Sequence, residues 1–361
     1  MKIAIIVHVP ASDGGGGFYA MATQSELLSL HGFEIHIYEP YSTNHPYMGE
    51  NIIFHDYRSH FLDFLQKIGK PGIFPLFLDV NFEEDYDYIY TFSPFYLLFI
   101  LMNRKYFKNT RKIIISTKDL LFPEKKSKKI LRYFTIMFYR ILRLKNLYLY
   151  NENSIESLMF KNLKVKTYEV PPLVNMNINT NSYNFSINCK FTVLFFGSVE
   201  KRKGAEMLFR ILEKFKNSNI IFKIAGNISY NYNEKAKNLK YENIIFLGAV
   251  DEKTKDYLLF NSDLGLMLSL EESYSIVTRE MLLHGLPVIT TWQPAIDIFG
   301  DYGIAYISDL ESIYNKIIEY EKEYLSSHES YMELRKGILL KYNKKFNKYD
   351  LEKQFLNIFD V

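Results

Sequence analysis

The sequence lacks several features that would assign it to a class directly. Its 361 residues include one cysteine, Cys189, which excludes a disulfide framework and a cysteine-based metal site. The longest apolar run, residues 95–102, is much shorter than the roughly 20 residues that a membrane-spanning helix needs. The amino-terminal MKIAIIVHV has neither a basic region nor a small-residue cleavage site, so we expect a strand there and not a signal peptide. These absences favour a cytoplasmic protein.

The chain also lacks a strong net charge, but its charges are unevenly distributed. Lys and Arg number 44 against 41 Asp and Glu, yet residues 104–145 contain 14 of the former and 2 of the latter. The segment KKSKKILRYFTIMFYRILRLK predicts a helix with a basic stripe, formed by Lys125, Lys129, Arg132, Arg140 and Arg143. Such a helix is typical of proteins on an anionic membrane surface, although a core helix with a solvated basic face has the same pattern. We expect peripheral attachment to the inner face of the cell membrane and no nucleic-acid partner, because no nucleic-acid-binding fold is recognisable.

Strand and helix patterns alternate in two series along the chain. Near-continuous apolar strands, such as residues 2–7 and 191–199, are typical of parallel sheets that helices cover on both faces. A stretch rich in Asn, Ser and Pro, residues 171–188, separates the two series. The pattern predicts two Rossmann-like parallel α/β domains, residues 1–170 and 189–345, joined by that linker. We expect the helix over residues 346–361 to pack back on the first domain.

Four glycines, residues 14–17, lie between the first strand and a helix. No Gly-Lys-Ser/Thr follows them, which excludes a P-loop. Gly15, Gly17 and Ala20 fit G-x-G-x-x-A, and Glu39 lies at the end of the next strand, as in dinucleotide-binding proteins. An NAD(P)-dependent oxidoreductase or epimerase is therefore one hypothesis, and a glycine turn without a ligand is another.

The segment EESYSIVTREMLLHGLPVIT, residues 271–290, predicts a helix at the carboxyl edge of the second sheet. Ser273 or Ser275 can cap a helix that begins near Ile276, and Gly285 can end it. Open α/β folds bind ligands at this edge. The free N–H groups of Ser275, Ile276 and Val277 are therefore expected to face a phosphate.

Two carboxylates flank this predicted helix start. Glu272 lies on the loop before it and Glu280 about one turn inside. A carboxylate can accept hydrogen bonds from two hydroxyl groups, so one acid suits a ribose and the other a sugar. The alternative, that these acids only favour the helix dipole, is our interpretation of Glu271.

A third segment, FFGSVEKRKG, places Lys201, Arg202 and Lys203 on a turn before a helix. Cations at a helix amino terminus oppose its dipole, so their clustering indicates a bound anion. The alternative is a solvated turn.

These segments resemble the retaining, nucleotide-sugar-dependent glycosyltransferases of the GT-B fold, a large family that includes sucrose synthase and bacterial mannosyltransferases. Its pattern Glu-x7-Glu, then Gly-x-Pro-Val, is carried by Glu272, Glu280, Gly285, Pro287 and Val288. FFGSVEKRKG resembles the family's Gly-Arg-…-Glu-Lys-Gly turn, and the glycine loop resembles its amino-terminal loop. The resemblance implies an acceptor-binding first domain that faces a donor-binding second domain across a cleft.

The resemblance also implies roles for individual residues. Lys203 and Glu272 would be catalytic, with Lys203 on the donor diphosphate and Glu272 on hydroxyls of the donor sugar. Glu280 would hold the ribose. The other expected donor-binding residues are Gly15, Gly16, Ser198, Arg202, Val250, Ser275, Ile276 and Val277. No metal and no cofactor are expected, and we interpret the Asp-x-Asp of residues 85–87 as a chance likeness to a metal motif.

The chain departs from the family pattern at three places. Ser198 stands where the family has a phosphate-binding arginine, so Lys201 or Arg202 would take its place. Ser273-Tyr274-Ser275 replaces Gly-Phe-Gly, which leaves the sugar open, and the family's histidine after a strand of the first domain has no counterpart. A catalytically degenerate, membrane-docked partner is therefore a further hypothesis.

The favoured hypothesis is a hexosyltransferase that takes its sugar from a nucleotide sugar. Its acceptor would be lipid-linked or an oligosaccharide, in bacterial surface polysaccharide or glycoconjugate synthesis.

Overall fold

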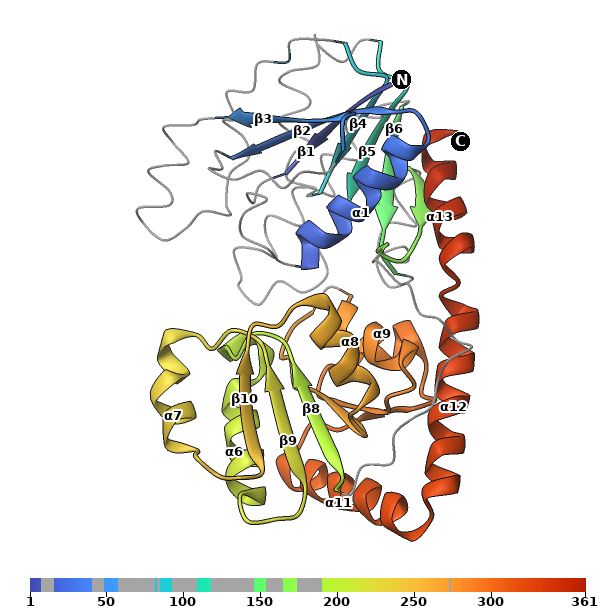
Figure 1. Cartoon of the computed structure of the whole chain (residues 1–361). Helices are drawn as coiled ribbons and strands as arrows, with labels where there is room; N and C mark the ends of the chain where they lie inside the picture. Colours follow the sequence, from blue (N-terminus) through green and yellow to red (C-terminus); the bar gives the residue numbers. More distant parts are fainter. Residues whose placement is uncertain are drawn as a thin grey trace. The chain divides into compact units, whose positions relative to one another are not determined.

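The computed structural model describes residues 1–7, 16–40, 49–57, 82, 85–92, 109–117, 146–153, 165–173, 190–272 and 274–361. The chain divides into two compact units (Figure 1). The first comprises Met1–Asn175 together with Lys348–Val361, and the second comprises Met176–Asn347. The predicted basic helix, Gly15 and most of the predicted linker lie outside the described residues.

The first unit is built on a seven-stranded sheet in which every pairing is parallel. The strand order is β3-β2-β1-β4-β5-β6-β7, with bounds β1 Lys2–Ile6, β2 Glu34–Pro40, β3 Ile52–Tyr57, β4 Tyr88–Thr91, β5 Lys112–Ser116, β6 Leu147–Asn151 and β7 Lys166–Glu169. Helix α1, Gly16–Leu30, follows β1. The central strand β1 is buried on both faces, which explains its continuous apolar sequence.

The segment Lys348–Val361 packs within the first unit as helix α13, Lys348–Leu356, and the turn η9, Asn357–Phe359. Lys112 of β5 is buried, and its Nζ donates to Oδ1 of Asp360 at 2.6 Å and to the carbonyl of Ile358 at 2.8 Å. The hydroxyl of Tyr88 donates to the carbonyl of Phe359 at 2.9 Å. A buried cation and a buried hydroxyl of this sheet thus bond to residues from the far end of the sequence, and Lys112 also donates to the hydroxyl of Tyr168 at 3.2 Å.

The second unit has a six-stranded sheet with only parallel pairings. The strand order is β10-β9-β8-β11-β12-β13, with bounds β8 Thr192–Phe196, β9 Ile221–Ala225, β10 Ile244–Gly248, β11 Leu264–Met267, β12 Val288–Thr290 and β13 Ile304–Tyr306. Its helical segments are η7 Lys201–Lys203, α6 Ala205–Phe215, η8 Tyr230–Tyr232, α7 Asn233–Asn238, α8 Glu252–Phe260, α9 Ile276–Leu283, α10 Pro294–Phe299, α11 Leu310–Ser326 and α12 His328–Lys345. The expected α/β class with two parallel sheets is confirmed.

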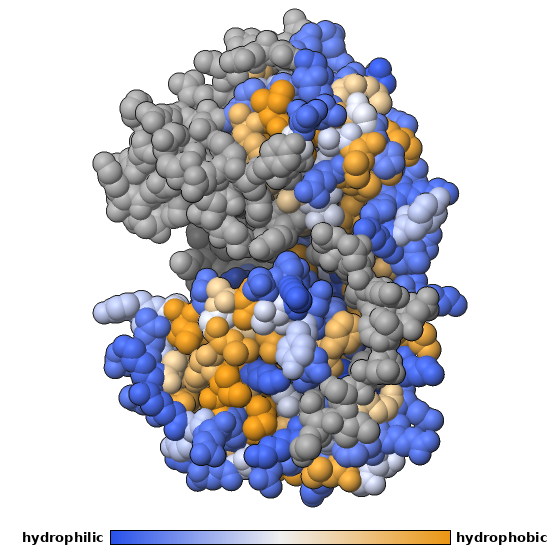
Figure 2. Space-filling model, in the orientation of Figure 1, coloured by the Kyte–Doolittle hydropathy of each residue, from blue (hydrophilic) through white to orange (hydrophobic). Residues whose placement is uncertain are grey.

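One face of the second sheet packs on helices α6 and α11, as the amphipathic sequence of α6 requires. Leu208, Ile211 and Leu212 of α6 are fully buried against Phe222 and Ile224 of β9. On the edge strand β10, alternate side chains face outward, and Ile245 and Leu247 are exposed. Figure 2 shows the hydrophobic patch over this part of the sheet. The main core of the unit therefore lies on one side of these strands.

The buried Arg335 of α12 contacts the carboxyl ends of both α8 and α9. Arg335 has no exposed surface, and it donates to the carbonyls of Gly285 and Phe260, each at 3.2 Å. Its guanidinium also lies 3.6 Å from the buried carboxylate of Asp263. Because these carbonyls lie just after α9 and at the end of α8, one side chain complements both helix dipoles and fixes the two helices together. Among the described residues, no helix has the length and apolar character to cross a bilayer.

Candidate active site

The site lies in the second unit, where the strand order changes direction. Successive strands from β8 to β10 are added on one side of the sheet, and those from β11 to β13 on the other. The loops after the neighbouring strands β8 and β11 therefore leave the carboxyl edge side by side, at the kind of switch point where open α/β sheets bind ligands. The first loop leads through η7 into α6, and the second leads into α9.

These two loops touch through their backbones. The N–H of Leu270 donates to the carbonyl of Arg202 at 2.9 Å. Gly204, at the start of α6, has a φ of 79°, and a Cβ at this position would lie 2.0 Å from the carbonyl oxygen of Leu268. Only glycine allows this approach, because it has no side chain and tolerates a positive φ. Gly204 thereby brings the cationic turn against the loop that carries Glu272.

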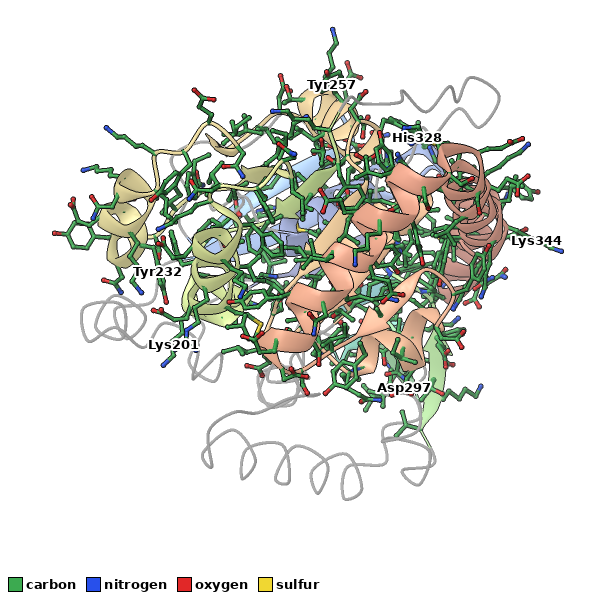
Figure 3. The ribbon with its side chains drawn as sticks, turned by 90° about the horizontal axis from the view of Figure 1, so that it is seen from below. Lys201, Tyr232, Tyr257, Asp297, His328 and Lys344 are labelled. Atoms are coloured by element: carbon green, nitrogen blue, oxygen red, sulfur yellow. The ribbon has the colours of Figure 1, made fainter. Side chains whose placement is uncertain are left out.

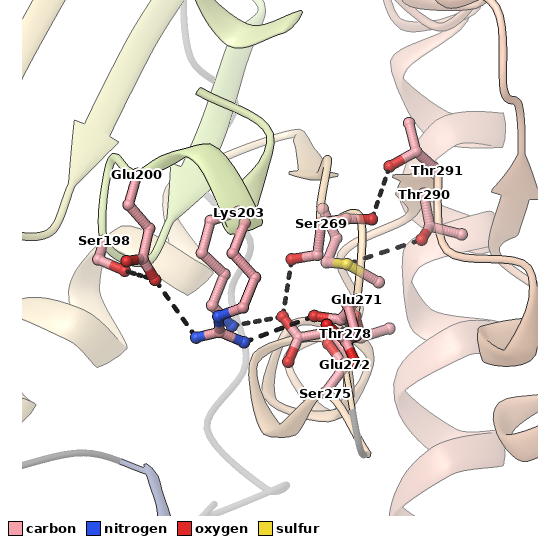
Figure 4. A network of polar contacts seen from close by, with 12 residues as sticks. Ser198, Glu200, Lys203, Ser269, Glu271, Glu272, Ser275, Thr278, Thr290 and Thr291 are labelled. Atoms are coloured by element: carbon pink, nitrogen blue, oxygen red, sulfur yellow. Dashed lines mark hydrogen bonds and ion pairs between the residues drawn. The ribbon is translucent and has the colours of Figure 1, made fainter. Parts of the chain in front are cut away.

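Lys203 and Glu272 meet across the two loops (Figure 4). The ammonium of Lys203 forms an ion pair with Oε1 of Glu272, and the hydroxyl of Ser269 donates to the same oxygen at 2.7 Å. The carbonyl of Ser269 in turn accepts from the hydroxyl of Thr291 at 3.0 Å. The Glu272 side chain is largely buried, at 11% exposed, and both of its contacts above are made by Oε1.

Ser198 and Arg202 are joined through Glu200, an acid that the sequence analysis missed. Oε1 of Glu200 accepts from the hydroxyl of Ser198 at 3.0 Å and from Nη2 of Arg202 at 3.3 Å. Arg202 also approaches the carbonyl of Glu271, at 3.5 Å. Lys201 is exposed and its side chain points outward (Figure 3). Of the two predicted replacements for the family's arginine, Arg202 is therefore the one tied to the site loops.

Ser275 occupies the cap position of α9 but does not cap it in the expected way. It has a φ of 61°, and its hydroxyl bonds to that of Thr278 at 2.7 Å and makes no bond to a backbone N–H. The left-handed conformation costs a residue with a side chain roughly 1–2 kcal/mol. Since the side chain leaves the first-turn N–H groups unbound, those of Ile276 and Val277 can still bind an anion.

Glu280 faces helix α8 and pairs with Lys255, which the sequence analysis also missed. Nζ of Lys255 lies 2.8 Å from Oε1 of Glu280 and 2.6 Å from Oε2 of Glu252, and the Lys255 and Glu280 side chains are each 12% exposed. Burial opposes the charge on Lys255, but the two carboxylates outweigh it and raise its pKa. One turn further along α9, Nδ1 of His284 donates to the carbonyl of Glu280 at 2.7 Å.

Other predicted residues fall in different places. Val250 is half-buried between β10 and α8, and Gly16 begins α1 in the first unit. Glu39, the acid of the dinucleotide-binding pattern, is fully buried at the end of β2, where it offers no surface to a ribose. Ser273 lies outside the described residues.

The Asp-x-Asp of residues 85–87 has structural partners. Asp87 accepts from the backbone N–H of Lys2 at 2.9 Å and pairs with Arg111 at 3.4 Å, while Asp85 accepts from Asn109. Among the described residues, no three His, Cys, Asp or Glu side chains gather as a metal site would require.

Comparison with solved structures identifies the fold. Over 100% of this chain and 98% of the other, the structure is similar to sucrose-phosphate synthase from Thermosynechococcus elongatus, with a TM-score of 0.73 and 15% identity. It is also similar to Anabaena HepE in complex with UDP and glucose, with a TM-score of 0.69 and 13% identity. That match covers 100% of this chain and 99% of HepE. For WaaG, a glycosyltransferase involved in lipopolysaccharide biosynthesis, the TM-score is 0.64 and the identity is 15%, over 99% of each chain. The fold is that of the GT-B glycosyltransferases, as the sequence predicted.

The family follows from the second unit. Residues 183–336 match the family model for glycosyl transferases group 1, and this range contains every site residue described above in that unit. The second unit is therefore a glycosyl transferases group 1 domain, which confirms the predicted family and enzyme class. An uncharacterized 41.2 kDa protein in the cps region of Klebsiella pneumoniae is 27% identical over 173 residues, 47% of this chain. The chain thus matches about half of the length of this relative, 46%.

Proposed function

We propose that the protein is a retaining hexosyltransferase that moves a sugar from a nucleoside-diphosphate sugar to an acceptor. The observation that carries this proposal is the arrangement at the switch point, where two lysine–glutamate pairs flank the uncapped start of α9. An anionic group at this helix start would meet free N–H groups and the cations of the η7 turn. A carboxylate on either side can accept hydroxyl hydrogen bonds, as a ribose and a hexose require.

Each group then has a distinct task. The diphosphate lies at the start of α9, near Arg202 and Lys203. Lys203 stabilises the charge that develops on the diphosphate as the bond to the sugar breaks, because an ammonium has three donors and Glu272 uses only one. Glu272 keeps the lysine in place and binds sugar hydroxyls with its second oxygen, and Glu280 binds the ribose. No metal is needed in this scheme, so EDTA should leave the rate unchanged.

The comparisons support the substrate class and the biological setting. HepE has been crystallised with UDP-glucose, which favours a nucleotide-sugar donor for this chain. The relative in a cps region and the lipopolysaccharide role of WaaG favour a lipid-linked or oligosaccharide acceptor in surface polysaccharide synthesis.

Attachment to the inner face of the membrane remains our proposal from the basic stripe in the sequence. Co-sedimentation with anionic and neutral vesicles tests it, and equal, salt-insensitive recovery with both would contradict it.

The decisive experiment is a screen of nucleotide sugars by thermal shift and by hydrolysis. One donor should raise the melting temperature and release its nucleoside diphosphate, whereas NAD(P) should do neither. The anomeric configuration of the transferred sugar, determined by NMR on a product with a model acceptor, tests retention. A chain that binds a donor without any turnover would be a degenerate partner, and the proposal would be wrong.

A further inference from the structure

Lys255 is a charged side chain of the second unit that the proposed chemistry does not use. It comes from α8, whereas the Glu280 carboxylate that it binds comes from α9. Its ammonium is 2.8 Å from Oε1 of Glu280 and 2.6 Å from Oε2 of Glu252. Both the lysine and Glu280 are 12% exposed, so the contact is largely shielded from solvent, and the two groups lose most of their hydration to make it.

The backbone around this contact is fixed by further bonds between the same two helices. His284 donates from Nδ1 to the carbonyl of Glu280 at 2.7 Å, and its Nε2 lies 3.7 Å from Oδ1 of Asp256 on α8. The rings of His284 and Phe260 pack edge to face with centroids 4.5 Å apart. Since the helices are already joined at this end and at Arg335, Lys255 is not needed to hold them together. Its specific effect falls on the Glu280 side chain.

A glutamate side chain has three rotatable bonds, and vicinal hydroxyls bind well only to a carboxylate whose position is fixed before they arrive. Lys255 engages one oxygen of Glu280 and leaves the other for a ligand. We propose that Lys255 positions Glu280 for the ribose diol and so determines the preference of this site for ribonucleotides over 2′-deoxyribonucleotides. This inference rests on the proposed function, because it takes Glu280 as the ribose ligand.

The alternative role of Lys255 is purely electrostatic. Removing the ammonium would then leave Glu280 and Glu252 as uncompensated negative charges that repel a diphosphate. Repulsion of this kind weakens ribo- and deoxyribonucleotides equally, since both carry the same phosphates. Loss of positioning weakens the ribonucleotide more, because it alone has the 2′-hydroxyl, whereas both ligands have the 3′-hydroxyl. The ratio of the two affinities therefore separates the two roles.

The test is calorimetric binding of UDP and 2′-deoxy-UDP, or of GDP and 2′-deoxy-GDP if the wild type binds GDP instead. We expect the wild type to prefer the ribonucleotide at least about tenfold, the effect of one hydrogen bond to a charged group. Lys255→Met should reduce this ratio to within about threefold, and should raise KM for the donor about tenfold with kcat changed less than twofold. Lys255→Arg, which keeps the charge and the donors, should restore most of the ratio.

Lys253→Met is the matched control, because Lys253 is exposed on the same helix and has no hydrogen bond or ion pair in the described part of the chain. It should change neither the ratio nor KM. If Lys255→Met folds and its ratio of ribonucleotide to deoxyribonucleotide affinity equals that of the wild type, the inference is wrong. The proposed function still holds in that case, provided that the wild type binds the nucleoside diphosphate. Absence of any nucleoside-diphosphate binding by the wild type overturns both. If Lys255→Met does not fold, Lys255→Gln and Lys255→Arg replace it in the test. An affinity ratio that is the same in both variants and in the wild type would also overturn the inference.

Discussion

Two lysine–glutamate ion pairs involve α9, one on the loop before it and one within it, and different contacts fix each of them. In the loop pair, Lys203–Glu272, both residues come from loops at strand ends, and backbone contacts and Ser269 fix them. In the helix pair, Lys255–Glu280, both residues come from helices, and a contact between His284 and Asp256 one turn away supports them. The loop pair lies at the switch point itself. We infer that the loop pair acts on the bond that breaks and the helix pair on the part of the donor that stays unchanged.

The largest effect expected from this comparison is on the loop pair. Lys203→Ala should lower kcat by about 10²–10³-fold, the loss seen when one donor to developing charge is removed, with a smaller change in KM. Initial rates of donor hydrolysis and transfer measure it. Lys201→Ala is the control, because Lys201 is exposed and points outward. Equal losses in the two variants would remove the catalytic role of Lys203.

Gly204→Ala should break the contact that brings the loop pair together. Its Cβ would clash with the carbonyl of Leu268 and would also require a positive φ, so we expect a loss of about 2–4 kcal/mol in the free energy of unfolding. Urea unfolding measures it. Gly248→Ala is a matched control, because Gly248 has a φ of 69° and its Cβ would meet nothing within 4 Å. That change should cost only about 1 kcal/mol, and equal costs would show that the close approach is unimportant.

On the helix pair, Glu280→Ala should raise KM for the donor by about 10–100-fold and change kcat less than threefold, since hydrogen bonds to a charged group contribute roughly 1.5–3 kcal/mol. Steady-state kinetics over a range of donor concentrations measure both constants. A fall in kcat with KM unchanged would place Glu280 in the chemical step and contradict the division between the pairs.

The smallest effect concerns the support of the helix pair. The hydrogen bond from His284 lowers the pKa of Asp256. A lowered pKa adds stability that is complete above the unfolded value near pH 4 and is lost as the pH falls through the folded value. Because the Asp256 side chain is 58% exposed, Asp256→Asn should cost at most about 0.5–1 kcal/mol at pH 7. Urea unfolding at pH 7 and pH 3 checks this, and a difference that persists at pH 3 would contradict it.

The two pairs also show which parts of the site the sequence could predict. Glu272 and Glu280 are recognisable because a strand, a loop and a helix start follow one another locally, and the spacing of the acids survives in the primary structure. Lys255 could not be found in this way, because it reaches Glu280 only after α8 and α9 pack together. The same holds for Glu200, whose role depends on the path of the turn that follows β8.

Arg279 illustrates a different limit of sequence reasoning. A helical arginine is expected in solvent, yet Arg279 has no exposed surface, and its guanidinium lies 5.4 Å from the ring centroid of Tyr274 and 5.6 Å from that of Phe346. Within the described part of the chain its nitrogens have no hydrogen-bond acceptor. Contacts with aromatic faces stabilise such a cation. Tyr274 is close to Arg279 in sequence, but Phe346 reaches it only in the folded structure.

The position of Lys348–Val361 within the first unit makes the second unit a single uninterrupted insertion in the polypeptide. Residues 176–347 can therefore be exchanged between relatives as one cassette, with only two junctions to design. The first unit, by contrast, is assembled from both sides of that insertion. Translation cannot complete the first unit until the second unit has been synthesised, because Ile358 and Phe359, whose carbonyls accept from Lys112 and Tyr88, follow the second unit in the chain. The second unit is thus free to fold during synthesis, before the first unit is complete.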